Sequence, residues 1–305
     1  MMLDVRIWYP AGAGGASVSV GDNAVFHGAP ARQDAAIAGH SLPAILLLHG
    51  GLRSAPDSGA WIASRLAAEG FVVAAPRPSR LEGARVKDAP EELWLRPADL
   101  SATLTGLQND PTFRSRLDNK AVGVLGFQRG GTAALALVGA RIDGQHYARS
   151  CDRGGTGMDC DWFASNGIDL HAIDLARAER SNLDRRVRAA VAVDPELSES
   201  WDPASLRAIS APVEVINLGE PVSIRAGLEA SSLAGAIPGA TYHTVAGATG
   251  SSAFNLCKPQ GPAALRQEGD DGALCRDGQR SRAGVHALLA QMTASFFRAN
   301  LPNGR

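Results

Sequence analysis

The chain has 305 residues, of which 45% are hydrophobic and 20% charged, proportions typical of a globular protein with a substantial core. Its formal net charge of −1, without a run of like charges, argues against a nucleic-acid or anionic-membrane partner. No apolar stretch approaches the roughly 18 residues that span a bilayer, so we expect no integral membrane segment.

Three strands of different character are predicted in the N-terminal region. "LDVRIWYP" alternates apolar and polar residues, which is typical of a half-buried edge strand that Pro10 ends. Residues 11–42 are rich in Gly, Ala and Ser, with one short strand predicted at Ala24–His27. "AILLLHGG" at Ala44–Gly51 is a continuous apolar run, as expected for a strand buried on both faces.

A helix, a strand and a second helix are predicted next. The first helix is expected to begin at a Ser58 cap and to stop at Gly70. "FVVAAP" then predicts a buried strand that ends at Pro76. Pro97 is expected near the start of the second helix, which runs to about Leu107.

The middle of the chain carries a sharp turn. The apolar strand at Val122–Leu125 runs into "GFQRGG", centred on Gln128, and an Ala- and Leu-rich helix follows. Residues 141–185 are polar, end in a predicted charged helix "AIDLARAERS", and are interpreted as an insertion or cap. Further strands are predicted in "VRAAVAVDP", "APVEVINLGEP" and "ATYHTVAG", before a closing helix "AGVHALLAQMTASFFRANL".

Strands that alternate with helices indicate an α/β fold, with a mostly parallel sheet covered by helices on both sides. We therefore expect residues 1–305 to form a single domain.

The four cysteines fall into two local pairs, Cys151/Cys160 and Cys257/Cys275, in polar, Gly-rich segments. Neither pair has CxxC spacing and no His cluster lies beside them, so no metal is expected. They either form disulfides, which implies an oxidising compartment such as the periplasm or the exterior, or are free cytosolic thiols. The first residues do not resemble a signal peptide. A leader was therefore trimmed, the start is internal, or the protein is cytoplasmic.

Several segments together carry a family resemblance. They are "VRIWYPA", "HGG", "RPADLSATL", "VGVLGFQRGG" and "LCRDGQRSRAGVHALLAQMTASFFRANL". With these segments in this order, the chain resembles the α/β-hydrolase fold, and within it the predicted dienelactone hydrolases and platelet-activating-factor acetylhydrolase-like esterases. The resemblance implies the α/β-hydrolase architecture. It also implies disulfides, because such proteins are commonly exported with similar cysteine loops.

The resemblance also implies where a catalytic triad would lie. The nucleophile position at the turn is Gln128, whose carboxamide does not attack an ester at a useful rate. The base position falls at Thr249 or Gly250 in "VAGATGSS", with no histidine nearby. For the acid, the sequence offers Glu220 in "NLGEP" or Asp194 in "VAVDPE".

Other residues are candidates to substitute for the missing groups. His243 lies on a predicted strand ahead of the segment "VAGATGSS", which holds the base position and is here called the base loop. For His243, a packing or surface role is favoured over catalysis. Ser251 and Ser252 lie in the base loop, where a hydroxyl without an imidazole stays unreactive, so they are interpreted as capping groups. His49 and His286 are interpreted as structural.

The backbone donors of an oxyanion hole do not depend on side chains. We expect the amides around Gly51, Leu52 and Arg129 to remain available to a carbonyl or carboxylate. Gln128 is expected to adopt a strained backbone conformation. Its carboxamide either binds a polar ligand or plugs the pocket.

Two functional hypotheses follow. The first is a non-hydrolytic pseudo-enzyme without cofactor that binds a small ester- or carboxylate-like ligand or a protein partner. The second is an enzyme: either an esterase with a relocated nucleophile, or a lyase or isomerase that uses Asp194, Glu220 or His243 as base. The oligomeric state does not follow from the sequence.

Overall fold

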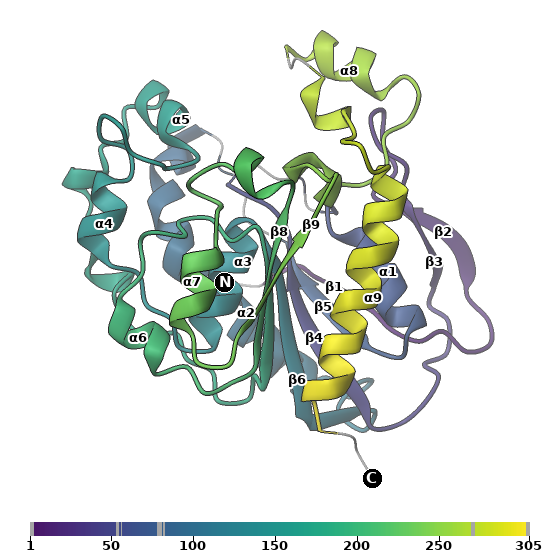
Figure 1. Cartoon of the computed structure of the whole chain (residues 1–305). Helices are drawn as coiled ribbons and strands as arrows, with labels where there is room; N and C mark the ends of the chain where they lie inside the picture. Colours follow the sequence, from purple (N-terminus) through teal and green to yellow (C-terminus); the bar gives the residue numbers. More distant parts are fainter. Residues whose placement is uncertain are drawn as a thin grey trace.

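The computed structural model describes residues 3–302 except 53, 54, 56, 78–80, 82, 270 and 271. Within these residues the core element is one seven-stranded sheet (Figure 1). Its strands, in spatial order, are β1 (Val5–Trp8), β5 (Val72–Pro76), β4 (Leu42–Leu48), β6 (Leu117–Phe127), β7 (Ala189–Val193), β8 (Val213–Leu218) and β9 (Thr241–Val245). Only β1 runs antiparallel to its neighbour, so the prediction of a mostly parallel sheet is confirmed.

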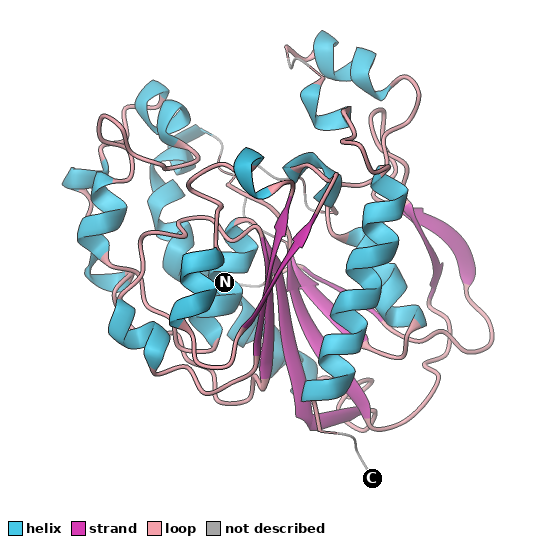
Figure 2. Cartoon of the chain, viewed as in Figure 1, coloured by secondary structure: helices cyan, strands magenta, loops and turns pink. Residues whose placement is uncertain are grey.

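Helices cover both faces of the sheet, which explains why its central strands are apolar throughout. On one face lie α1 (Ala60–Ala68) and α9 (Arg282–Asn300), and on the other lie α2 (Glu92–Asn109), α3 (Arg129–Leu137), α6 (Pro203–Arg207) and α7 (Ser231–Ala236) (Figures 1 and 2). Successive side chains of a strand point to opposite faces. Ile45 and Leu47 therefore join the core under α1 and α9, whereas Leu46 joins the core under α2 and α3.

The region before β4 differs from its prediction. A separate two-stranded sheet pairs β2 (Ala16–Val20) with β3 (Ala29–Gln33). The strand predicted at Ala24–His27 is wrong, because Asn23 Oδ1 accepts hydrogen bonds from the backbone N–H groups of Val25 and Phe26 and bends the chain. Only an isolated bridge between Phe26 and Cys257 remains there.

Two predicted helix starts are also wrong. The residue that caps α1 is Gly59, and the Ser58 hydroxyl instead donates to the carbonyl of Ala55 at 2.8 Å. Pro97 lies inside α2 rather than near its start, because the 3₁₀ segment η1 (Gly83–Glu91) winds directly into the helix at Glu92.

The segment 141–185 holds two short helices, α4 (Gly144–Arg149) and α5 (Cys160–Ser165). The charged helix predicted at its end is wrong, and the 3₁₀ turns η2 (Leu170–Ala172) and η3 (Leu175–Arg177) stand there instead. Asp169 and Asp174 each accept a hydrogen bond from a backbone N–H two residues ahead, which starts one turn at a time.

Both cysteine pairs form disulfides, Cys151–Cys160 and Cys257–Cys275, and this accounts for all four cysteines of the chain. Two disulfides are consistent with an oxidising compartment. Within the described ranges, no helix has both the length and the apolar character needed to cross a membrane.

The closing helix α9 provides a direct test of the packing. Phe297 is fully buried, and its ring lies over Gly123 of β6, where an added Cβ would stand 2.4 Å from the ring. We expect Phe297→Ala to lower the free energy of unfolding by about 3–5 kcal/mol, because it leaves a cavity. The half-buried Phe296 is the matched control, and Phe296→Ala should cost clearly less. Urea unfolding measures both losses, and equal losses would contradict this packing.

Candidate functional site

The sharp turn between β6 and α3 places Gln128 at the carboxyl edge of the sheet. Its backbone has φ 53° and ψ −122°, the strained conformation expected from the sequence. Glycine is required on both sides, because a Cβ on Gly126 would lie 1.9 Å from the carbonyl oxygen of Gly130. A Cβ on Gly130 would lie 2.0 Å from the carbonyl oxygen of Leu48. The strand, the turn and the helix therefore meet in van der Waals contact.

The Gln128 side chain folds against the loop that follows β4. The backbone N–H of Gly51 donates to Gln128 Oε1 at 2.9 Å. Because this partner is a donor, it identifies the carbonyl oxygen of the amide and leaves Nε2 on the other side. Among the described residues Nε2 has no hydrogen-bond partner. The N–H of Gly51, which the sequence led us to expect as a free donor, is thus bonded to the side chain of Gln128.

The residue after Gln128 belongs to a buried charge network. Arg129 is 2% exposed and contacts Glu196 through Nε at 3.0 Å and Asp159 through Nη2 at 3.1 Å. Burial lowers the pKa of Arg129, because it disfavours the charged guanidinium. The nearby carboxylates, chiefly that of Glu196, outweigh this effect and raise the pKa above its ordinary value. Burial raises the pKa of Glu196, against the pull of Arg129. Asp159 is adjacent to Cys160, so the Cys151–Cys160 disulfide loop is tied to the turn.

A second buried arginine holds the loop after β4. Arg96 is 3% exposed and pairs with Glu92 at 2.7 Å. It donates to the carbonyl oxygens of Gly50 at 2.8 Å and Gly51 at 3.0 Å. Because Arg96 fixes the orientation of these two peptide groups, the N–H of Gly51 points toward Gln128.

Of the two acid candidates, Asp194 is buried and lies beside Gly250. Its Oδ1 accepts hydrogen bonds from Asn217 Nδ2 and from the N–H of Leu218, both at 2.8 Å. Burial raises the pKa of the Asp194 carboxyl to about 6, although these two donors lower it. Glu220 is exposed, and its carboxylate accepts from the N–H of Gly247 at 3.0 Å.

Of the two base positions, Gly250 is the one that faces Asp194. A Cβ built on Gly250 would lie 3.8 Å from Asp194 Oδ2 and would meet no other described side chain within 4 Å beyond its chain neighbours. Thr249 instead caps η5 (Gly250–Ala253), exchanging bonds with Ser252. A histidine side chain at position 250 would reach the carboxylate, but the residue present has no side chain.

The remaining candidates serve the structure. His49 Nε2 bonds the carbonyl of Ala253 at 2.7 Å, and burial lowers the His49 pKa to about 4. His286 Nε2 bonds the carbonyls of Ser252 and Phe254 at 3.1 and 3.0 Å, and burial lowers its pKa to about 3. Both rings are neutral donors that hold the base loop from its buried side.

His243 and the two loop serines stay outside the site chemistry. His243 lies in the middle of the edge strand β9, with its side chain half exposed and 3.6 Å from Glu214. The Ser252 hydroxyl is fully buried and accepts from the N–H of Thr249 at 3.1 Å. Ser251 is half-buried in η5.

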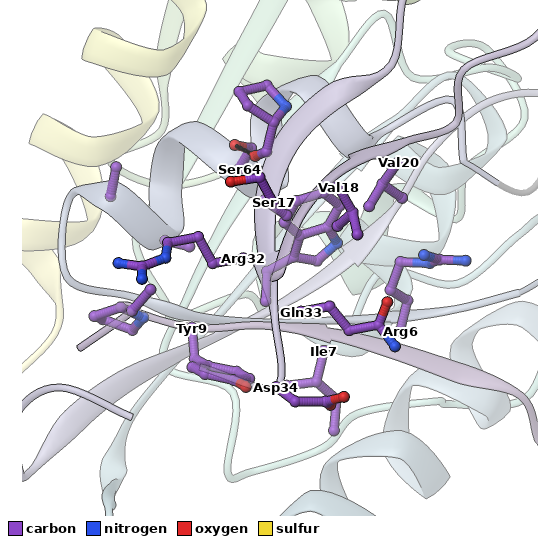
Figure 3. A pocket seen from close by; sticks show the side chains of 17 residues that line it. Arg6, Ile7, Tyr9, Ser17, Val18, Val20, Arg32, Gln33, Asp34 and Ser64 are labelled. Atoms are coloured by element: carbon purple, nitrogen blue, oxygen red, sulfur yellow. Dashed lines mark hydrogen bonds between the residues drawn. The ribbon is translucent and has the colours of Figure 1, made fainter. Parts of the chain in front are cut away.

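A separate cavity of about 660 Å³ lies between β1, the β2–β3 sheet and α1 (Figure 3). Several of its polar groups already bond to protein. Tyr9 donates to the carbonyl of Ala35 at 3.0 Å, and Ser64 donates to the carbonyl of Pro30 at 2.7 Å. No residue of the turn lines it. In the part of the chain that the structure describes, no cluster of His, Cys, Asp and Glu could hold a metal ion.

Sequence reasoning missed Glu196, Asn217, Arg96 and Asp159. Asn217 left a usable signal, because it is a polar residue inside the apolar strand "VEVINL". It is fully buried and accepts from the N–H of Ala230 while it orients Asp194. The other three gave no such signal, because their roles depend on which loops meet in space.

Comparison with known proteins places this geometry in a fold. No family model and no curated protein matches the sequence. A ferulic acid esterase from Streptomyces cinnamoneus is similar in structure, with a TM-score of 0.64, 18% identity, and coverage of 98% of this chain and 82% of that chain. A dienelactone hydrolase from Anabaena variabilis has a TM-score of 0.50, 15% identity, and coverage of 96% and 100%. The predicted α/β-hydrolase fold is confirmed.

The buried carboxyl of Asp194 predicts a pH dependence of stability. Its pKa in the folded chain is about 6, against 3.8 ordinarily, so the folded state keeps a proton that the unfolded state loses between these values. Its contribution to stability therefore falls as the pH rises from 4 to 7, by about 2–3 kcal/mol. The unfolding free energy of wild type should drop by this amount relative to Asp194→Asn, as measured by urea unfolding at both pH values. If the unfolding free energy of wild type instead rises relative to that of Asp194→Asn between pH 4 and 7, a cation stabilises the carboxylate.

Proposed function

We propose that this α/β-hydrolase-fold protein is a non-hydrolytic member of its fold that binds a small carbonyl- or carboxylate-bearing ligand. The observation that supports this most is the carboxamide of Gln128, which stands at the nucleophile position and bonds the N–H of Gly51. Opposite Asp194, the base position is Gly250. Acyl transfer by this fold requires a nucleophile that an imidazole deprotonates.

The expected loss of catalytic rate on removing the triad supports the proposal. A serine hydrolase without its triad retains only about 10³–10⁴ of acceleration over water, which comes from binding and the oxyanion hole. Here Gln128 Oε1 occupies one donor of that hole, so even this remainder is diminished.

The same groups suit a ligand that accepts hydrogen bonds. Gln128 Nε2 offers two N–H groups, and the backbone N–H of Arg129 lies at the start of α3, where the helix dipole favours negative charge. A carboxylate or carbonyl oxygen matches both donors.

A second candidate function is a lyase or isomerase with Asp194 as general base. It is favoured by the pKa of Asp194, which burial raises to about 6, near the range suited to proton transfer. In this case Asp194→Asn abolishes turnover, whereas Gln128→Ala only weakens substrate binding. Glu220 and His243 are less suited to this role because both are exposed.

We also propose the domain organisation around this site and the compartment of the protein. Residues 141–185 form a cap within a single domain, and the ion pair between Asp159 and Arg129 ties the cap to the turn. The two disulfides favour the periplasm or the exterior as the compartment.

Restoring the missing groups tests the proposal. Gln128→Ser alone should remain inactive toward p-nitrophenyl esters and unlabelled by a fluorophosphonate probe, because no base faces the new hydroxyl. The double variant Gln128→Ser/Gly250→His should hydrolyse the esters at least about 10²-fold faster than the single variant, since general-base catalysis contributes about 10²–10⁴-fold.

The matched control moves the imidazole by one residue. Gln128→Ser/Thr249→His should stay at the level of the single variant, because Thr249 faces Ser252 rather than Asp194. Robust hydrolysis by Gln128→Ser alone would mean that a base already serves this position and would overturn the proposal.

A further inference from the structure

Asp194 has one oxygen that the protein uses and one that it leaves open. The side chain is only 3% exposed, and Oδ1 accepts from Asn217 and from the backbone of Leu218. Among the described residues Oδ2 has no hydrogen-bond partner. A carboxylate at a buried position usually has all its lone pairs engaged or is paired with a cation.

The open oxygen faces the position where a side chain of residue 250 would begin, here called the vacancy because no described side chain fills it. The ideal Cβ direction of Gly250 points to within 3.8 Å of Oδ2, and no other described side chain approaches that position within 4 Å. Among the described residues, no side chain therefore fills the position beside Asp194 Oδ2.

Hydrogen bonds fix the backbone of the loop that contains Gly250, next to the vacancy. Thr249 and Ser252 cap the η5 turn at one end of the loop. On the buried side, His286 bonds the carbonyls of Ser252 and Phe254, and Trp61 donates to the carbonyl of Ala253 at 2.7 Å. Because these bonds fix the backbone of the loop, it does not collapse onto Asp194.

Among the residues that the structure describes, no cation pairs with Asp194. The groups that act on its carboxyl are Asn217 and the Leu218 N–H, both uncharged. The nearby Tyr242 hydroxyl bonds Asn217 Oδ1 at 3.0 Å and Glu229 at 3.3 Å. Arginines 96 and 129 are engaged by Glu92, Glu196 and Asp159.

We propose that Asp194 and the vacancy at Gly250 form a subsite for a protonated nitrogen base of the ligand, such as an imidazolium, amidinium or ammonium group. An N–H of this group donates to Asp194 Oδ2 in the place that a histidine side chain would occupy. The inference rests on the proposed non-hydrolytic function, because a ligand group takes this place only where no residue of the chain does. It extends that function from an oxygen-bearing ligand to one that also carries a nitrogen cation.

Imidazole is the probe that tests the subsite. We expect it to bind the full-length chain saturably at millimolar concentration, which suits a probe of five heavy atoms, and to shift the backbone amide resonances of Asp194 and Gly250 in NMR spectra. Equal concentrations of sodium chloride should not produce these shifts.

Three variants decide the interpretation. Asp194→Asn removes the anion, and Gly250→His fills the vacancy, so each should weaken imidazole binding at least tenfold. Glu220→Gln removes the other, exposed carboxylate and should bind as wild type does. Thermal unfolding without imidazole verifies that each variant is folded.

The outcomes separate this inference from the proposed function. Absent saturation, or saturation that persists in Asp194→Asn, overturns the subsite and leaves the non-hydrolytic proposal standing if the wild type is esterase-silent. Saturable binding that is lost in Asp194→Asn supports the subsite even where the wild type turns out to hydrolyse esters. A shift in the Gly250→His variant equal to that of wild type would place imidazole elsewhere and overturn the inference.

Discussion

The hydrogen bond from the backbone N–H of Gly51 to Gln128 Oε1 joins the two loops that define the site. In a hydrolytic member of this fold such a donor is offered to the developing oxyanion of the substrate. Here the donor is bonded within the protein, to the carboxamide of Gln128, which we propose to stand in the place of the attacking group. Under the proposed function, the carboxamide replaces the nucleophile, and its contact with Gly51 also takes up a donor that would stabilise the transition state. The backbone of Gln128, at φ 53°, is the strained conformation that makes this contact possible.

Buried charges keep this contact in place. Arg96 fixes the carbonyls of Gly50 and Gly51, and Arg129 joins Glu196 below the turn to Asp159 of the disulfide loop. Removing one partner of such a buried pair costs about 3–5 kcal/mol, because it leaves an uncompensated charge. The neutral imidazoles of His49 and His286 likewise fix the base loop through hydrogen bonds to its carbonyl groups. Buried side chains therefore hold the backbone on both sides of the proposed site, around Gln128 and around Gly250.

The sequence predicted the features that depend on local pattern. Apolar runs identified the central strands, and the glycines of "GFQRGG" identified the turn at Gln128, because only glycine permits that approach of β6 to α3. It did not predict β2 and β3, whose short polar stretches resemble loops. Nor did it decide between Asp194 and Glu220 or between Thr249 and Gly250. These choices depend on the direction of a single Cα–Cβ bond and on Asn217, a partner 23 residues away in the chain.

The central claim is that the wild-type chain lacks the means of acyl transfer, and its own ester hydrolysis tests this most directly. Purified wild type should turn over p-nitrophenyl acetate and butyrate no faster than Gln128→Ala, and both should match a non-catalytic protein at equal concentration. Wild-type turnover that Gln128→Ala or Asp194→Asn reduces tenfold or more would contradict the account, because the carboxamide and the carboxyl would then belong to working catalytic machinery.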